Sequence, residues 1–149
     1  MELKVKALSP KIGRELPLPT FATDGAAAMD LRACIDSPVI IPAGERRVIP
    51  SGIAIALPSA DYVALLFSRS GMGIKSGISL SNSVGVIDSD YRGEIGVGLH
   101  NTSDADYTVN PGDRIAQLMI TPVIRPTVTL TDELPASERG AGGFGSTGR

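Results

Sequence analysis

Short apolar segments recur along nearly the whole chain, and residues typical of turns separate them. In these segments hydrophobic residues either alternate with polar ones or form runs too short for a helix. Gly, Pro, Asn or Asp occupies nearly every gap, and a helical period is almost absent. The expected strands cover residues 3–8, 29–34, 38–42, 46–50, 52–58, 62–67, 77–87, 94–101, 107–110, 114–123 and 126–134. The pattern predicts an all-β fold of many short strands, either a sandwich, a jelly roll or a barrel.

Two segments depart from this strand pattern. SGMGIKSG, residues 70–77, is the one plausible helical turn. From residue 136 onward the chain is rich in glycine and has Phe144 as its single large apolar residue, so it cannot bury enough surface to order itself. We therefore expect one β domain over residues 1–135 and a flexible glycine-rich C-terminal arm over residues 136–149. The arm is either a frayed terminus or a segment that closes on a ligand, in which Arg139 meets an anion and Phe144 stacks on a base.

The composition narrows the choice of partners and of cellular setting. The net charge is −2 and no run of Lys or Arg occurs, so a nucleic-acid partner is not expected, although a small anionic ligand is possible. Cys34 is the only cysteine and His100 the only histidine, which leaves neither an intrachain disulfide nor a typical structural zinc site. We find neither the apolar run of a membrane span nor that of a secretory signal. We expect a cytoplasmic protein with no membrane partner.

The stretch GVIDSDYRGEIGV concentrates charge between two strand-like segments. A solvated hairpin turn explains such a cluster, because Asp starts turns and Gly ends them. Alternatively, Asp88 follows the bulky Val86 and Ile87, whose side chains could partly desolvate its carboxylate and make it a general base. Tyr91 supplies a flat ring nearby, and Asn82 has both a donor and an acceptor with which to read an imide edge.

The segment FSRSGMG joins a strand to the expected helical turn. Arg69, Ser70 and Gly71 could hold an anion there through a guanidinium, a hydroxyl and backbone N–H groups. A polar junction with no ligand is the alternative.

Two further strands carry polar residues among apolar ones. In GDRIAQLMI, simple alternation places Gln117 on the same apolar face as Ile115 and Met119, where its amide needs either a structural partner or a ligand. In AAAMDLRA, Asp30 and Arg32 flank a leucine and form either a solvated face or a site whose carboxylate orients water around Mg²⁺.

Taken in order, these segments resemble the motifs of the homotrimeric dUTP pyrophosphatases (dUTPases). AAAMDLRA, RSGMG, NSVGVIDSDYRGEI, GDRIAQLMI and RGAGGFGSTG are similar to the family's five motifs, and the resemblance covers nearly the whole chain. It implies a jelly-roll-like β fold and a homotrimer with active sites at subunit interfaces, each closed by a neighbour's glycine-rich arm. It also implies Mg²⁺-dependent hydrolysis of dUTP to dUMP and pyrophosphate, which limits uracil in DNA and supplies dUMP for dTTP synthesis.

The resemblance further implies a role for each matched residue. Asp88 would activate water for attack on the α-phosphorus, and Tyr91 would pack under the deoxyribose and exclude a 2′-hydroxyl. Asp30 would reach the metal through water, Mg²⁺ being held mainly by substrate phosphates, and Arg139 would meet the γ-phosphate. The other matched substrate-binding residues are Arg69, Ser70, Gly71, Asn82, Gly85, Val86, Ile87, Gln117, Phe144, Gly145, Ser146 and Thr147. Ser68 stands where many members have proline, which concerns loop detail rather than chemistry.

Three other functions compete with this interpretation. A dCTP deaminase resembles the family in fold, but no glutamate lies in a segment like that enzyme's catalytic motif. A non-catalytic trimeric β protein that senses nucleotide or binds a regulatory partner is a second alternative. A serine hydrolase that uses His100 is a distant third, because no GxSxG segment is present.

Overall fold

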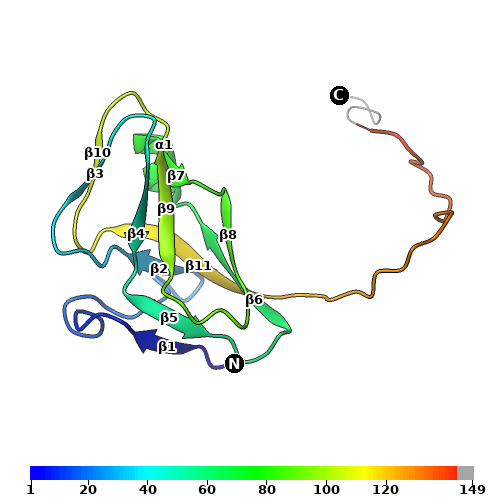
Figure 1. The fold of residues 1–149 in the computed structure, drawn as a ribbon, viewed down its shortest axis with the longest axis horizontal. Coiled ribbons are helices and arrows are strands. Elements are labelled where there is room, and N and C mark those ends of the chain that lie inside the picture. Colours follow the sequence, from blue (N-terminus) through cyan, green and yellow to red (C-terminus); the bar gives the residue numbers. More distant parts are fainter. Residues whose placement is uncertain (144–149) are drawn as a thin grey trace.

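The structure is a computed structural model that describes residues 1–143, and all but one of its regular elements are short strands (Figure 1). The strands are β1 (Lys4–Ala7), β2 (Met29–Arg32), β3 (Val39–Ile41), β4 (Arg46–Pro50), β5 (Ile53–Ala56), β6 (Tyr62–Phe67), β7 (Ile78–Leu80), β8 (Val84–Ile87), β9 (Gly96–Asn101), β10 (Tyr107–Val109) and β11 (Arg114–Pro122). A short helix, α1 (Ser70–Ser76), stands between β6 and β7. Within the described range, no helix is long and apolar enough to cross a membrane.

The strands of the described range form several small antiparallel sheets. The largest is four-stranded, in the order β2-β11-β6-β8, and the next is three-stranded, in the order β4-β9-β7. β1 pairs with β5 and β3 pairs with β10. Most of these pairings join segments far apart in sequence, as between β2 and β11. The predicted all-β, jelly-roll-like fold with one short helical turn is confirmed.

Alternate residues of these strands fill a core between the sheets. The four-stranded sheet contributes Leu31, Leu66 and Leu118, and the three-stranded sheet contributes Val97 and Leu99, all buried. Burying such side chains stabilises the fold by roughly 1.5–3 kcal/mol each. Because strand residues alternate between faces, the polar residues between them lie on the outer faces, where they are free to form a site.

A β-bulge in β11 changes which of its residues face the core. The register against β2 shifts between Arg114 and Ala116, and both Ile115 and Ala116 are buried. The partly exposed Gln117 lies on the outer face instead, directly opposite Asp30 across the ladder. The prediction that Gln117 shares the apolar face with Ile115 is therefore wrong, because simple alternation does not allow for the extra residue of a bulge.

The segment predicted as one strand over residues 77–87 is two strands. Residues 81–83 form a turn between β7 and β8, where Ser83 adopts a left-handed backbone with a φ of 63°. β7 belongs to the three-stranded sheet and β8 to the four-stranded one. The turn therefore carries the chain from one sheet to the other and places Asn82 at the junction.

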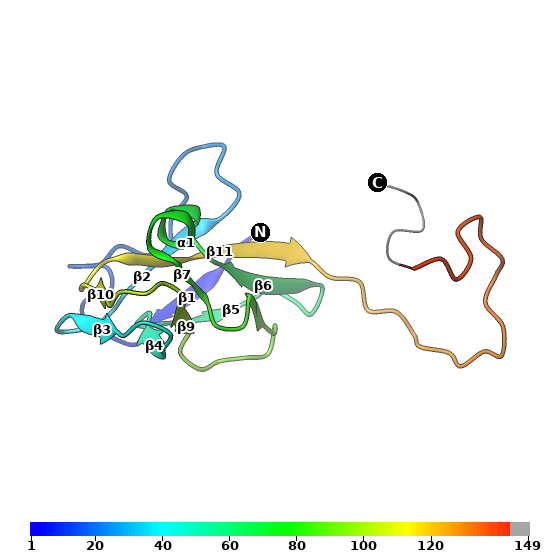
Figure 2. The same ribbon diagram turned by 90° about the horizontal axis from the view of Figure 1, so that it is seen from above.

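After β11 the chain leaves the β domain as a long arm (Figures 1 and 2). The strand predicted over residues 126–134 does not form, and its apolar residues Val128 and Leu130 are 91% and 97% exposed. A strand needs a partner for its backbone groups, and in the described part of this chain none pairs with the segment. The extended arm thus begins near Val123, upstream of the glycine-rich stretch.

Candidate active site

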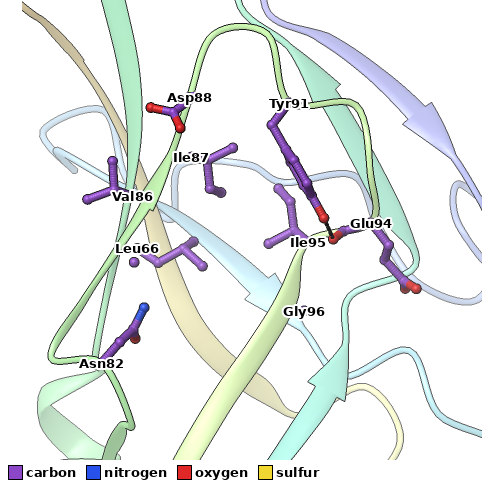
Figure 3. Close-up of a pocket in the computed structure, with 10 residues that line it drawn as sticks. Leu66, Asn82, Val86, Ile87, Asp88, Tyr91, Glu94, Ile95 and Gly96 are labelled. Carbon is purple, nitrogen blue, oxygen red and sulfur yellow. Dashed lines mark hydrogen bonds between the residues drawn. The ribbon is translucent and has the colours of Figure 1, made fainter.

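A cavity of about 220 Å³ opens between β8 and the loop that leads to β9 (Figure 3). Its lining residues are Leu66, Asn82, Gly85, Val86, Ile87, Asp88, Tyr91, Glu94, Ile95 and Gly96. Six of them were singled out from the sequence: Asn82, Gly85, Val86, Ile87, Asp88 and Tyr91. Sites for drug-sized ligands usually measure roughly 300–1,000 Å³, so this cavity suits a small group such as a base with its sugar.

One wall of the cavity depends on the close approach of β8 to β6. Gly85 is paired with Leu66 across the ladder, and a Cβ added at Gly85 would lie 2.9 Å from the Cβ of Leu66. Glycine is therefore required for β8 to pack at this distance. Gly85 is buried but lines the cavity. Asn82 lies at one end of the strand and Asp88 at the other (Figure 3).

Asp88 follows directly on β8 and is exposed. Side chains alternate along the strand, so Asp88 continues the outward row of Val86, which is 62% exposed, while Ile87 points into the core. The expectation that Val86 and Ile87 partly desolvate the carboxylate is thus wrong for a single chain. The Asp88 side chain is instead exposed at the rim of the cavity, where water can reach its carboxylate.

The loop after Asp88 is a compact turn that presents Tyr91. The Tyr91 N–H donates to the Asp88 carbonyl over 3.2 Å, and Arg92 Nη1 donates to the carbonyls of Ser89 and Tyr91 over 2.8 Å each. The Tyr91 hydroxyl donates to the Glu94 carbonyl over 3.0 Å (Figure 3). These bonds fix the ring on the side of the cavity opposite β8. The stretch is a solvated turn, as predicted, but it is not a hairpin, because β8 and β9 belong to different sheets. The same turn lines the cavity.

A second group of polar residues lies on the outer face of the four-stranded sheet. The two carboxylate oxygens of Asp30 accept hydrogen bonds from Arg69 Nε over 3.0 Å and from Arg114 Nη1 over 3.2 Å. The Asp30 side chain is only 14% exposed, so its interpretation as a solvated face beside Arg32 is wrong. Gln117 lies opposite Asp30 in the neighbouring strand. Two guanidiniums around one carboxylate leave this group with a net positive charge, which suits an anionic ligand.

Helix α1 begins directly after this group. Arg69 is its N-cap, and Ser70 and Gly71, both exposed, form its first turn, which has neither a side-chain cap nor an acidic residue. The first turn itself therefore supplies no negative charge at this end of the helix, where an anion would be favoured. Ser68 accepts the N–H of Leu80 over 2.8 Å, which ties the loop before the helix to β7.

Among residues 1–143, no three His, Cys, Asp or Glu side chains converge in a way that could hold a metal ion. Asp30 is the one carboxylate beside the two arginines, and both of its oxygens already accept hydrogen bonds. Mg²⁺ prefers oxygen ligands and keeps several waters. Because both oxygens of Asp30 are bonded to arginines, a Mg²⁺ ion near this group would contact Asp30 through water rather than directly.

The two groups do not share a cavity in the described chain. None of Asp30, Arg69, Ser70, Gly71 and Gln117 lines the cavity that contains Asp88 and Tyr91. Arg139 lies on the arm, where its Nε donates to the Gly142 carbonyl over 2.9 Å. Arg139 does not line the cavity, and the arm projects away from the β domain in both ribbon views (Figures 1 and 2). The remaining arm candidates, Phe144, Gly145, Ser146 and Thr147, lie outside the described residues.

Sequence reasoning missed Arg114 and Glu94. Arg114 stands in the segment GDRIAQLMI, but only the pairing of β11 with β2 reveals that it faces Asp30. Glu94 belongs to the charged cluster but was given no role, because its contact with Tyr91 runs through a backbone carbonyl that no residue type signals.

Comparison with known families and proteins gives a consistent result. The dUTPase family model matches residues 14–148. The chain is 47% identical over 148 residues to the deoxyuridine 5'-triphosphate nucleotidohydrolase of Serratia proteamaculans (strain 568), covering 99% of this chain and 97% of that protein. It is 50% identical over 150 residues to the protein of the same name from Psychrobacter sp. (strain PRwf-1), with coverage of 99% and 97%.

Solved structures agree with the sequence relatives. The dUTPase of Staphylococcus bacteriophage 80alpha, determined with dUpNHpp, superimposes with a TM-score of 0.86 at 29% sequence identity and 99% coverage of both chains. A variant of the dUTPase from phage phi11 of S. aureus, described as coordinating a structural Mg(II) ion, superimposes with a TM-score of 0.79 at 25% identity, covering 91% of this chain and 100% of that one. The family predicted from the five sequence segments is confirmed.

Proposed function

This chain belongs to the dUTPase family, and we propose that it hydrolyses dUTP to dUMP and pyrophosphate in a Mg²⁺-dependent reaction. The observation that carries this proposal is the single cavity lined by Asn82, Gly85, Asp88 and Tyr91. It combines a hydrogen-bonding amide, the backbone of a glycine, an aromatic ring held by a hydrogen bond and an exposed carboxylate. The relatives' printed name, nucleotidohydrolase of deoxyuridine 5'-triphosphate, and the analogue dUpNHpp found with a neighbouring structure support the same substrate.

The nucleoside half of dUTP would occupy the cavity. The Asn82 amide and the backbone of Gly85 to Ile87 provide donors and acceptors for the uracil edge. The ring of Tyr91, held by its bond to Glu94, would lie under the deoxyribose and leave no space for a 2′-hydroxyl. Sites built on such polar complementarity can discriminate by roughly 10⁴–10⁵ against a mismatched substrate.

Hydrolysis would begin at the rim of this cavity. Asp88 would accept a proton from a water molecule while the oxygen of that water attacks the α-phosphorus. The bond from this phosphorus to the bridging oxygen of the leaving pyrophosphate would then break. The exposed position of Asp88 leaves its carboxylate accessible to water. Bound Mg²⁺ would supply electrostatic stabilisation of the charge on the leaving pyrophosphate, with Asp30 as its protein contact through water.

The triphosphate would lie against the positive group. Arg69, Ser70, Gly71 and Gln117 are the proposed phosphate contacts, and their surroundings have an excess of positive charge. Arg139 would meet the γ-phosphate from the arm, and Phe144 would cover the uracil, with Gly145, Ser146 and Thr147 as further contacts. In other enzymes, an arginine that a mobile segment brings to the phosphates raises the rate by roughly 10³–10⁵. Part of this effect comes from the exclusion of water when the segment closes over the site.

Two features of the described chain support a homotrimer with shared active sites. The cavity and the positive group are separate within one chain, so a complete site needs groups from more than one subunit. The outer edge of β8 exposes Val84 and Val86, and the arm exposes Ile124 and Leu130. Apolar side chains along an arm that has no packing partner of its own are suited to burial against another copy. The trimer would act in the cytoplasm, limiting uracil in DNA and supplying dUMP for dTTP synthesis.

A product assay tests the proposed reaction. Purified protein with dUTP and Mg²⁺ should release dUMP and pyrophosphate, whereas dTTP, dCTP and UTP should react far more slowly. Release of ammonia from dCTP would indicate a deaminase instead, and nucleotide binding with no turnover would indicate a sensor.

A further inference from the structure

The Asp30 carboxylate is shared between two arginines that come from different parts of the chain. Arg69 Nε binds one oxygen and Arg114 Nη1 binds the other. Arg69 Nη1 also donates to the Arg114 carbonyl over 3.5 Å, so the two arginines touch each other directly. Asp30 and Arg69 have side chains 14% and 21% exposed, whereas Arg114 is 45% exposed. Arg114 therefore lies on the solvent side of the ion pair between Asp30 and Arg69.

The bulge in β11 is what brings Arg114 to this side of the sheet. Residues three apart in a regular strand point to opposite faces, so Arg114 and Gln117 would lie on opposite faces without it. The register shift between Arg114 and Ala116 inserts one residue. Asp30, Gln117 and Arg114 therefore share the outer face. Bulges often re-aim a side chain beside a functional site, and here the re-aimed side chain binds the carboxylate that holds Arg69.

Arg114 also determines how strongly Asp30 neutralises Arg69. With both guanidiniums present, one negative charge is divided between two positive ones. Without Arg114, the carboxylate would pair with Arg69 alone, and one of its oxygens would be left in a partly buried position with no partner among the described residues. Leaving such an oxygen without a hydrogen bond costs free energy, so the carboxylate would rotate. The Arg69 guanidinium is bonded to this carboxylate and would therefore move as well.

We propose that Arg114 is a positioning residue of the phosphate site: by binding Asp30 it fixes Arg69 and leaves that guanidinium with positive charge for the ligand. This inference rests on the proposed function, because the ligand is the triphosphate of dUTP. It also gives Asp30 the role of holding the two arginines. This role is compatible with a water-mediated contact between Asp30 and Mg²⁺.

The test compares Arg114→Gln with Arg14→Gln, a control at an exposed arginine that is bonded to neither Asp30 nor Arg69 in the described chain. Binding of dUpNHpp and of dUMP is measured by calorimetry for both variants and the wild type. Losing one charge-assisted contact should weaken dUpNHpp binding by about tenfold, and dUMP binding by a smaller factor, while the control matches the wild type. Equal weakening of both ligands would indicate a merely structural role and would overturn the proposal, as would unchanged binding. Arg114→Lys should recover part of the loss because it restores the charge.

A second measurement is independent of nucleotide. The ¹⁵Nε–¹H signal of Arg69, assigned with Arg69→Lys, should exchange slowly with water in the wild type because that N–H is bonded to Asp30. Arg114→Gln should accelerate its exchange, and unchanged exchange would overturn the proposal. If the wild-type protein binds no dUpNHpp, the proposed function fails, and this signal still decides whether Arg114 positions Arg69.

Discussion

The hydroxyl of Tyr91 is bonded to the backbone carbonyl of Glu94 over 3.0 Å, across a turn that Gly93 makes possible. A side chain at Gly93 would collide with the phenol of Tyr91. Glu94 is itself anchored, because its carboxylate accepts the Gly52 N–H over 2.8 Å, and the next residue, Ile95, donates its N–H to the Ile53 carbonyl over 2.9 Å. The ring that lines the cavity is thus attached to the framework around β5.

We expect Tyr91→Phe to reduce discrimination between dUTP and UTP. The ring remains, but its hydrogen bond to Glu94 is lost, and a bond of this kind contributes about 0.5–1.5 kcal/mol, or roughly twofold to twelvefold. Gly93→Ala, which displaces the ring itself, should have the larger effect. The measurement is kcat/KM for both nucleotides. If both variants keep the wild-type ratio, the ring does not select the sugar.

Asp88→Asn should retain dUTP binding and lose nearly all turnover. The amide keeps the size of the side chain but cannot accept a proton from water, and general bases contribute about 10²–10⁴ in rate. Equilibrium binding of dUTP and the rate of pyrophosphate release are measured on the same preparation. Asp90→Asn is the matched control, since Asp90 lies in the same loop but does not line the cavity. Turnover at the wild-type rate in Asp88→Asn would contradict the assignment of the base.

Truncation after Leu134 should cripple hydrolysis and leave the oligomer intact. It removes Arg139 and the glycine-rich segment but keeps the exposed apolar residues Ile124, Val128 and Leu130, which we expect to contact a neighbouring subunit. Sedimentation gives the oligomeric state, and steady-state kinetics give the rate. Arg139→Ala in the full-length chain separates loss of the guanidinium from loss of the whole arm. Wild-type rates in the truncated protein would remove the arm from the mechanism.

The sequence predicted the cavity residues well because they are close together in the chain. Asn82, Asp88 and Tyr91 lie on the two turns that flank β8, and only the second of these turns was predicted from the sequence. Their proximity follows from the short stretch of chain between them, whereas the wall at Leu66 depends on the pairing of β8 with β6. The positive group is different: Asp30, Arg69 and Arg114 come from segments far apart in sequence, and their contact depends on a register that a bulge shifts.

The errors in the sequence predictions also have physical causes. Alternation placed Gln117 on the wrong face, because a bulge leaves no signature in the order of apolar residues. Residues 126–134 have the composition of a strand but find no partner strand in the described chain. A strand pattern predicts which faces a segment would have, not whether its backbone groups find a partner.

Asn101 is expected to be the most sensitive polar residue of the core. It is fully buried, and its side-chain amide donates to the carbonyls of Ile41 and Ala105 over 2.9 and 2.8 Å and accepts the Ser103 N–H and hydroxyl over 3.0 and 2.7 Å. Asn101→Ala should lower the free energy of unfolding by on the order of 3 kcal/mol, because several partners lose their bonds inside the protein. Denaturant unfolding measures this, with the exposed Asn110→Ala as control. Equal loss in both variants would contradict the assignment.

Tyr107 makes stability depend on pH in alkaline solution. Burial raises the pKa of its phenol above the ordinary value of 10.0, nearby Asp113 adds to the rise, and Arg69 opposes it. As the pH rises past 10, the unfolded chain releases this proton while the folded chain still holds it, so the free energy of unfolding falls. The contribution of Tyr107 to the free energy of unfolding is fully present below that pH, where both the folded and the unfolded chain keep the phenol proton.

Tyr107→Phe should therefore unfold with a weaker pH dependence than the wild type between about pH 9 and 11. Denaturant unfolding of both proteins at equal concentration measures the difference. At neutral pH the phenol is protonated in both the folded and the unfolded chain. The difference in free energy of unfolding between the wild type and Tyr107→Phe at that pH therefore gives the effect of losing the hydroxyl alone. Because the two curves share every other titrating group, only Tyr107 can change the difference between them as the pH rises. Curves that stay parallel across this range would show that folding does not perturb the phenol.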